Sequence, residues 1–369
     1  MIPFGPHHPD ASGINTQVVR SAKNVLPAQI GFKPLQAPSA SSNAVDSTVY
    51  GSAVIIKNDG NAAQFCGTAT KLYKLTAGAW SDVSRTSPVG YSTAAGERWR
   101  FAQWGTLVIA TNYTNSVQVY DTASSTNFTF IGGTAPNARY ITVIRDQVIL
   151  GAINGNENRV HWSGTNNTSF WTPGTQNCDY QDFPNGGPIR GLIGGSVGYV
   201  FQAWTVTRMT QTPGAATIYQ FDEVQGAKGL AAPNSLVKVG DVAYYMASDG
   251  FYKMDLVSGG QTPIGVNKWR QAFLDDMRAG MELSVLGAAD PVNPIVIWAY
   301  VSKDNGTLTP DRMVIYDTVL DEATLADISC EAMATWVTAG VTLDTMNSYG
   351  TLDTLPYSLD SPFWKGGAS

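Results

Sequence analysis

The feature that most restricts the fold of this chain is a β-hairpin pattern that recurs along it. Each copy has a short apolar run, a turn rich in Gly, Asn or Asp, and a second run, which is the sequence signature of a hairpin. The copies occupy residues 62–75, 105–121, 146–164, 198–209, 240–256 and 294–318. The second runs also resemble one another: VQVYDT at 117–122 nearly coincides with MVIYDT at 313–318.

Such hairpins cannot be stable one at a time, because a lone hairpin leaves its faces exposed to water. Stacking them in a ring buries each sheet between its neighbours and leaves few free edges. The copies lie at irregular intervals of about 40–50 residues, the range expected for a propeller blade. We therefore predict an all-β chain that folds as a β-propeller of about six blades. A pair of β-sandwiches is the alternative, but it does not explain why the second strands resemble one another.

The segments outside the hairpins set the expected domain boundaries. Six prolines fall within residues 2–38, which favours an extended arm over a blade. We expect an extended N-terminal arm over residues 1–47, the propeller over residues 48–340, and an extended C-terminal docking segment over residues 341–369.

Two segments have a helical pattern. Trp269, Phe273 and Met277 are spaced four residues apart, and Gly280 is placed as a C-cap, so residues 267–280 are predicted to form a short amphipathic helix on the propeller. A second helix is predicted over residues 321–336.

The charge of the chain argues against a protein that holds nucleic acid. Charged residues make up 14% of the 369 residues, and the net charge is −6. Phosphate binding rests on clustered Lys and Arg, and no such block is present. A neutral-to-acidic surface would instead let DNA pass without sticking.

The cysteines and the start of the chain indicate the compartment. Cys66, Cys178 and Cys330 lie far apart with no CxxC pair, which favours free thiols in a reducing cytoplasm. The first residues do not have the pattern of a signal peptide, and no apolar run reaches the roughly 18–20 residues of a membrane span. We expect a soluble protein made in the cytoplasm.

Few residues offer catalytic chemistry. His161 is the only histidine outside the arm, and with Cys66 or Cys178 it could be imagined as a Cys–His hydrolase. Its place in the strand pattern RVHWSG favours a packed strand histidine instead. His7 and His8 lie beside prolines, and a lone His pair is poor evidence of a metal site.

Other polar and glycine-rich groups are assigned structural roles. The acid pairs Asp275–Asp276 and Asp321–Glu322 are expected on the solvated faces of the two helices. The glycines within residues 190–198 precede a strand, so they do not form a phosphate cradle at a helix start. We predict no catalytic, cofactor-binding or metal-binding residues, and a chain that is not an enzyme.

The end of the chain repeats a tetrad of hydroxyl, Leu, Asp and hydroxyl residues, which contains Asp344, Asp353 and Asp360. A calcium site is disfavoured, because the glycine-rich loops of calcium-binding repeats are missing. We expect an extended run that docks on the same or a neighbouring subunit, with a disordered end as the alternative.

Several stretches, in the same order and over nearly the whole chain, resemble the tail proteins of short-tailed phages: the tail nozzle protein (tail tubular protein B) and the packaged-DNA stabilisation, or tail hub, protein. The stretches include NVLPAQIGFKPL, WSDVSR, WRFAQWGTLVIATN, APNARYITVIRDQVILG, RVHWSG, GGPIRGLIGGSVGYVFQ, FDEVQGAKGLAAPNSLVKVGDVAYYMASDGFYKMD, PIGVNKW and TLDTLPYSLDSPFWKGG. The chain stops where longer nozzle relatives continue into further β domains.

The resemblance implies a structural protein of the virion neck or tail, made in the host cytoplasm. Such a protein forms a ring, expected to be a homohexamer, below the portal or adaptor protein. The ring carries tail fibres or spikes and surrounds the DNA exit channel, through which double-stranded DNA passes without sequence-specific binding.

Two other functions stay open, a propeller that hydrolyses glycans and one that binds glycans or a receptor. The stretch WSGTNNTSFW at residues 162–171 loosely resembles the Ser-x-Asp-x-Gly-x-x-Trp hairpin of sialidase propellers, but it lacks the Asp and the Gly.

Overall fold

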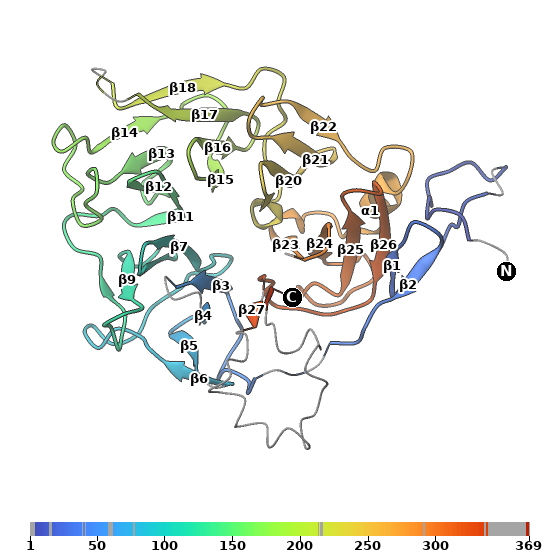
Figure 1. Cartoon of the computed structure of the whole chain (residues 1–369), viewed down its shortest axis with the longest axis horizontal. Helices are drawn as coiled ribbons and strands as arrows, with labels where there is room; N and C mark the ends of the chain where they lie inside the picture. Colours follow the sequence, from blue (N-terminus) through green and yellow to red (C-terminus); the bar gives the residue numbers. More distant parts are fainter. Residues whose placement is uncertain are drawn as a thin grey trace.

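The chain folds as a six-bladed β-propeller. A computed structural model describes residues 4–14, 17–38, 40, 42–57, 62–76, 78–212, 214, 217–290, 292–335, 337–338 and 367–368. Its six four-stranded antiparallel sheets follow one another in sequence order around a central axis (Figure 1). The first strand of each blade lies nearest the centre, and the fourth lies at the outer edge.

Blades 1 to 3 comprise residues 51–182. Blade 1 has strands β3 (Gly51–Ile56), β4 (Ala62–Gly67), β5 (Leu72–Thr76) and β6 (Ala79–Asp82). Blade 2 has β7 (Arg100–Trp104), β8 (Leu107–Thr111), β9 (Gln118–Asp121) and β10 (Thr129–Phe130). Blade 3 has β11 (Ala138–Ile144), β12 (Gln147–Ile153), β13 (Asn156–Trp162) and β14 (Asp179–Asp182).

Blades 4 to 6 comprise residues 189–326. Blade 4 has β15 (Ile189–Ile193), β16 (Gly198–Gln202), β17 (Val206–Gln211) and β18 (Tyr219–Glu223). Blade 5 follows a 3-10 turn, η1 (Pro233–Ser235), and has β19 (Val237–Val239), β20 (Val242–Ala247), β21 (Gly250–Asp255) and β22 (Gln261–Pro263). Blade 6 follows a second 3-10 turn, η2 (Glu282–Ser284), and has β23 (Leu286–Ala289), β24 (Ile295–Tyr300), β25 (Arg312–Asp317) and β26 (Glu322–Ala326).

The six hairpins predicted from the sequence are the second and third strands of the six blades, so this prediction is confirmed. In β21, for example, Tyr252 and Met254 are buried, whereas Lys253 and Asp255 on the opposite face are more exposed. The middle strands are recognisable because neighbouring blades cover them, which demands apolar residues. The first and fourth strands are shorter or more polar, and their pattern is weaker.

The N-terminal arm lies along the outer edge of blade 6 (Figure 1). Strands β1 (Val25–Pro27) and β2 (Phe32–Pro34) form a small hairpin. Just before β1, Lys23 pairs in parallel with Leu325 of β26, and the Leu325 amide donates to the Ala22 carbonyl at 3.1 Å. The arm therefore covers an edge that would otherwise expose unpaired backbone groups.

The predicted helix over residues 267–280 exists but is shorter. Helix α1 (Arg270–Asp276) buries Trp269, Phe273 and Met277 against the propeller, as the spacing predicted. Gly280 is not its C-cap, because the backbone is already extended at Met277. Within the described residues, no helix combines the length and hydrophobicity needed to span a bilayer.

The second predicted helix, over residues 321–336, is wrong. Residues Glu322–Ala326 form strand β26, which pairs with β25 on one side and with the arm on the other. The free edge of blade 6 offers a full ladder of hydrogen bonds, and this tertiary pairing outweighs a weak helical preference.

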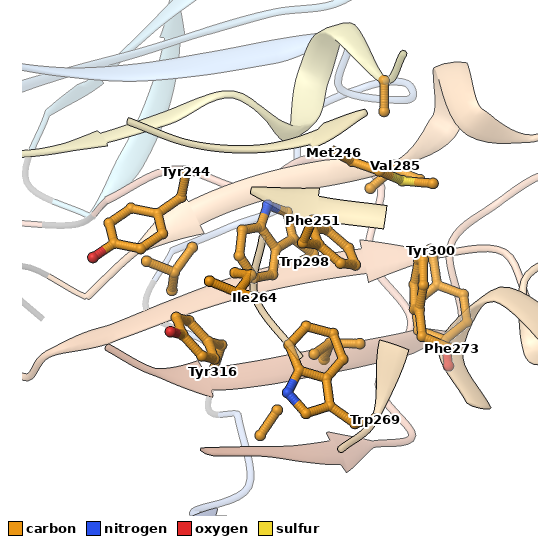
Figure 2. Close-up of a cluster of buried hydrophobic side chains, with 14 of the residues drawn as sticks. Tyr244, Met246, Phe251, Ile264, Trp269, Phe273, Val285, Trp298, Tyr300 and Tyr316 are labelled. Carbon is orange, nitrogen blue, oxygen red and sulfur yellow. The ribbon is translucent and has the colours of Figure 1, made fainter. Parts of the chain in front are cut away.

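The largest core cluster joins blades 5 and 6. Trp298 of β24 is fully buried between the two sheets (Figure 2). Its indole N–H donates to the Ser235 carbonyl at 2.9 Å, and its ring lies 4.3 Å from that of Phe251. Blades 1 and 2 are joined as closely: a Cβ on Gly67 would come within 2.3 Å of the Trp99 ring. Only glycine allows that approach.

The ring closes without a shared sheet, since blades 1 and 6 each come from one continuous stretch of chain. Residues 327–335, here called the seam segment, connect them. Cys330 N donates to the Pro310 carbonyl of blade 6 at 3.1 Å, and Val49 N donates to Glu331 Oε2 at 3.1 Å just before blade 1.

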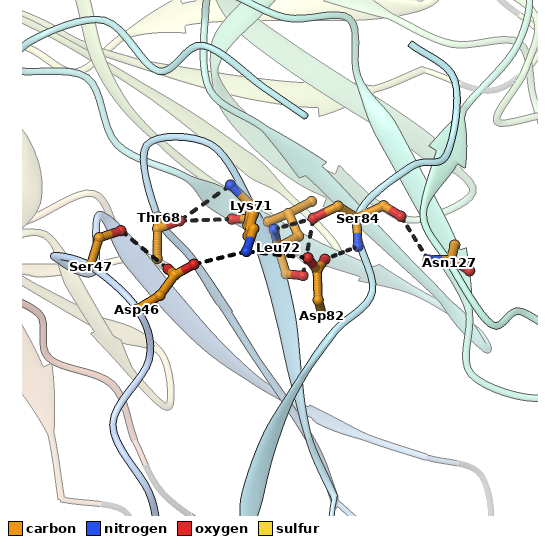
Figure 3. Close-up of polar contacts among 8 residues, drawn as sticks. All are labelled: Asp46, Ser47, Thr68, Lys71, Leu72, Asp82, Ser84 and Asn127. Atoms are coloured by element: carbon orange, nitrogen blue, oxygen red, sulfur yellow. Dashed lines mark hydrogen bonds and ion pairs between the residues drawn. The ribbon is translucent and has the colours of Figure 1, made fainter. Parts of the chain in front are cut away.

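A polar cluster fixes the linker that leads into blade 1 (Figure 3). The Lys71 ammonium contacts Asp46 of the linker at 2.8 Å and Asp82 of β6 at 3.7 Å. The Asn127 amide of blade 2 donates to the Ser84 carbonyl at 2.7 Å. The Lys71–Asp46 contact holds the linker against blade 1, and the Asn127–Ser84 bond joins blade 2 to the segment that follows β6.

Candidate functional site

The central channel is the cavity that all six blades build together. Its volume is about 300 Å³, and its lining comes from the inner strands, the turns just before them, and Ala332 and Met333 of the seam segment. From blade 1 to blade 6, the lining includes Gly51, Arg100, Tyr140, Gly191, Asn234 and Gly287. Glycines on three of the inner strands keep those strands close to neighbouring chain; a Cβ on Gly287, for instance, would come within 2.7 Å of the Ser235 carbonyl oxygen.

Arginines gather in this channel and at one of its ends. Arg98 and Arg100, at the start of β7, line the channel itself. Arg100, Arg139 and Arg190 line an adjoining cavity of about 310 Å³ together with Glu97 and Glu157. Each of these arginines lies at the start of an inner strand, which places them all near the same end of the ring.

Arg139 is neutralised by two carboxylates. Its guanidinium donates to Glu97 at 2.8 Å and to Glu157 at 2.9 Å, and it lies 4.1 Å over the Tyr113 ring. The hydrogen bond from Arg139 holds the pKa of Glu157 below its usual value. This group is an ion-pair network in which one guanidinium faces two carboxylates, so the Arg139 charge is fully compensated.

His161 and Cys178 are brought together in blade 3. The thiol lies 3.6 Å from His161 Nε2, and both side chains are buried. Burial raises the pKa of the Cys178 thiol to about 11 and lowers that of His161. At neutral pH both groups are therefore uncharged, whereas a nucleophilic cysteine needs a thiolate. The arrangement fits the packed strand histidine predicted from the sequence, between the rings of Trp171 and Tyr180.

His7 and His8 fasten the arm to blade 6. The buried His7 ring places Nδ1 2.8 Å from the Ala323 carbonyl oxygen, and His8 Nε2 lies 2.9 Å from Glu322 Oε1. Lys268 also contacts Glu322, at 3.3 Å. No three His, Cys, Asp or Glu side chains within the described ranges are grouped to hold a metal ion.

The acid pairs are not solvated helix faces, so that prediction is wrong for three of the four residues. Asp276 accepts from the Tyr300 hydroxyl at 2.7 Å and pairs with Arg312. Asp321 and Glu322 lie at the start of a strand and both contact Lys268. Only Asp275 is an exposed helix residue with a local partner. The sequence could not reveal these partners, because they come from other elements of the fold.

Two further predictions concern glycines and the chain end. The glycines of residues 190–198 belong to the β15–β16 hairpin, as predicted, and do not precede a helix. The tetrads with Asp344, Asp353 and Asp360 lie outside the described residues.

The arginines of the channel and of the adjoining cavity were missed by the sequence analysis. Arg98, Arg100, Arg139 and Arg190 are scattered over 93 residues, so they form no run that charge patterning could detect. Their one shared signal is position, since each falls at the start of the first strand of a blade.

Comparisons with known proteins support the fold and nothing finer. The sequence matches no family model and no curated protein sequence. The extracellular domain of the putative hybrid two-component system BT4673 from B. thetaiotaomicron is similar in structure, with 13% identity and a TM-score of 0.51, over 81% of this chain and 36% of that one. The computationally designed Ika8 protein aligns with 10% identity and a TM-score of 0.44, over 82% of this chain and 94% of that one. A chain of the Mitotic Checkpoint Complex aligns with 10% identity and a TM-score of 0.47, over 82% and 90%. At 13% identity the BT4673 domain bears on architecture alone, and the other two alignments, with TM-scores below 0.5, carry no argument.

Proposed function

We propose that this chain is a non-enzymatic structural subunit of the neck or tail of a short-tailed phage. The observation that carries the proposal is the ordered resemblance to tail nozzle and hub proteins. The resembling stretches fall on the arm and on strands of blades 1 to 5: WRFAQWGTLVIATN, for example, covers β7 and β8, and GGPIRGLIGGSVGYVFQ covers β15 and β16. None of them falls on the strands of blade 6.

The arrangement of the arm is consistent with a subunit that meets other proteins. The arm reaches the outer edge of blade 6, and the hydrophobic side chains of Phe4, Ile14 and Ile30 on it are 68%, 91% and 81% exposed. Apolar groups presented on an extended arm are suited to contacts with a neighbouring subunit.

The proposed assembly is a homohexameric ring below the portal or adaptor protein that carries fibres or spikes. Double-stranded DNA would pass through the bore between subunits. The central cavity of the single propeller, with a volume of about 300 Å³, is too small to admit a duplex. A neutral-to-acidic lining is a prediction for that larger bore.

Two measurements test this proposal. Mass determination of the purified chain in solution should give a hexamer, or a monomer that becomes a ring when mixed with its neck proteins. Electron microscopy of particles labelled with an antibody to the chain should place it at the tail. A particle that lacks the chain and still ejects its DNA would refute the proposal.

A glycan-binding function has one observation in its favour. A cavity of about 560 Å³ lies between the outer strands of blades 3 and 4, lined in part by Asp179, Tyr180 and Phe221. Aromatic rings beside carboxylates are suited to sugars. However, the Arg159 guanidinium lies 3.8 Å over the Tyr180 ring and occupies one of its faces. Binding to a panel of bacterial surface polysaccharides, lost on Y180A substitution, would favour this alternative.

A further inference from the structure

The junction between blades 6 and 1 differs from the other blade junctions. Each of the others contains a hydrophobic cluster to which both neighbouring sheets contribute. The face of blade 6 that points away from blade 5 packs instead against the arm and the seam segment, through Leu26, Leu35, Ile328, Cys330 and Met333. Among the residues that the structure describes, no hydrophobic cluster joins blade 6 to blade 1.

A groove of about 630 Å³ lies at this junction, on the face of blade 1. It is lined by the linker before blade 1, by β3 and β4, by Trp80 of β6, and by Ala332 and Ala334 of the seam segment. Ile55 is buried in the core between blades 1 and 2, so its neighbour Val54 points to the opposite side of β3, toward the groove.

Hydrogen bonds fix the walls of the groove relative to one another. Trp80 N donates to Asn43 Oδ1 at 2.9 Å, which ties the linker to blade 1. Val49 N donates to Glu331 Oε2 at 3.1 Å, which ties the linker to the seam segment. The groove is therefore preformed. Most of its lining residues are apolar, and covering such a surface is favourable.

The chain leaves the seam segment beside this groove and returns to the same place. Strand β27 (Val337–Thr338) starts three residues after Ala334, and it pairs antiparallel with β28 (Gly367–Ala368). Residues 339–366, here called the tail segment, therefore begin and end at one two-stranded ladder.

The last part of the tail segment carries two large aromatic residues, Phe363 and Trp364. Trp364 precedes β28 by three residues, and three residues span at most about 10 Å. Ala334 of the groove lies equally close in sequence to β27. The groove is therefore within reach of both aromatic side chains.

We propose that this groove binds the chain's own tail segment, with the side chains of Phe363 and Trp364 inside it. Cavities of about 300–1,000 Å³ hold drug-sized molecules, so the groove has room for this aromatic pair. Docked there, the tail segment covers the face of blade 1 that no core cluster covers. The ladder of β27 and β28 tethers the tail segment beside the groove, which gives it an advantage over any free competitor. This contact does not depend on the assembly proposed above.

Trypsin cleavage of the full chain after Lys365 tests the docking. Lys365 follows Trp364 directly, so docking of Trp364 protects this bond and the cleavage rate reports the undocked population. The rate is read by mass spectrometry as loss of residues 366–369. We expect W364A to raise it about tenfold or more, because burial of a large apolar side chain favours the docked state by at least that factor.

A change on the groove wall should have the same effect. V54D places a charge on the apolar wall and should also speed cleavage after Lys365 about tenfold. Should V54D fail to fold, A332W serves the same purpose, because it fills the groove without adding a charge. Val257 is 66% exposed on blade 5, so V257D is the matched control and should be cleaved at the parental rate.

The double variant W364A/V54D separates a direct contact from two unrelated effects. If Trp364 occupies the groove, the double variant is cleaved no faster than either single variant, whereas independent effects multiply to about a hundredfold. Multiplying effects, or cleavage of W364A at the parental rate, would overturn the proposal. Protection that is lost on dilution would assign the groove to the tail segment of a second copy, and the intrachain contact would be wrong.

Discussion

Docking of the N-terminal arm depends on Asp10 at the start of helix α1. Its carboxylate accepts from Gln271 N and from Ala272 N, both at 2.8 Å. No side chain of the helix itself caps these amides, so Asp10 acts as an N-cap supplied from a segment 260 residues away in sequence. Losing an N-cap costs about 0.5–2 kcal/mol, and a carboxylate at a helix N-terminus adds about 0.3–1 kcal/mol.

We expect D10A to weaken arm docking by about 1–2 kcal/mol, which raises the population of the undocked arm about 5- to 30-fold. Trypsin cleavage after Lys23 reports this population, because the backbone on both sides of Lys23 is hydrogen-bonded to Leu325 when the arm is docked. The initial rate of cleavage at this site, read by mass spectrometry, should rise by the same factor. D10N keeps an acceptor without the charge and should fall between the two.

Asp222 is exposed on blade 4 and far from the arm in sequence and structure, so D222A is the matched control. It should be cleaved after Lys23 at the parental rate. The reasoning fails if D10A is cleaved no faster than D222A.

Three further predictions concern the arm, the core and the thiols. Burial lowers the pKa of His7 below its ordinary 6.5, so the undocked arm takes up a proton at higher pH than the docked arm does. Docking should therefore be full above pH 6.5 and weaken as the pH falls below it, which faster hydrogen exchange of residues 19–25 would report. The H7Q substitution should remove this pH dependence. W298A should lower the free energy of unfolding, measured by urea denaturation, by about 3–5 kcal/mol, because a large side chain is removed from a closed core. W204A, at a site 72% exposed, should change it by no more than about 0.5 kcal/mol. Equal changes in the two variants would contradict the packing of blades 5 and 6. Burial raises the pKa of Cys66 to about 12 and those of Cys178 and Cys330 to about 11. A disulfide reagent at pH 8 should therefore label the three thiols slowly in the native protein and quickly in guanidinium chloride. A fast labelling phase in the native protein would refute the burial of these thiols.

The elements that carry a strong local pattern were predictable from the sequence. The middle hairpin of each blade is covered on both faces by neighbouring sheets, so its residues must be apolar and its turn must be tight. Helix α1 was visible for the same reason, since Trp269, Phe273 and Met277 recur at helical spacing. His161 could be assigned to a packed strand because it lies in the strand pattern RVHWSG, and β13 buries Val160, His161 and Trp162 together.

The elements fixed by distant partners were not predictable. Residues 322–326 form a strand only because an open blade edge and the arm lie on either side, and the arm itself docks through Asp10, His7 and His8 to residues that lie more than 250 positions away. The arginines at the centre come from three blades: Arg98 and Arg100 from blade 2, Arg139 from blade 3 and Arg190 from blade 4.

The sequence by itself therefore determined the repeating unit, since burial between sheets selects residues locally along each hairpin. Only the tertiary structure decided how the ring is closed, where the arm is held and which charges meet at the centre. These features are pairings between segments remote in sequence, and their geometry exists only when all six blades are in place.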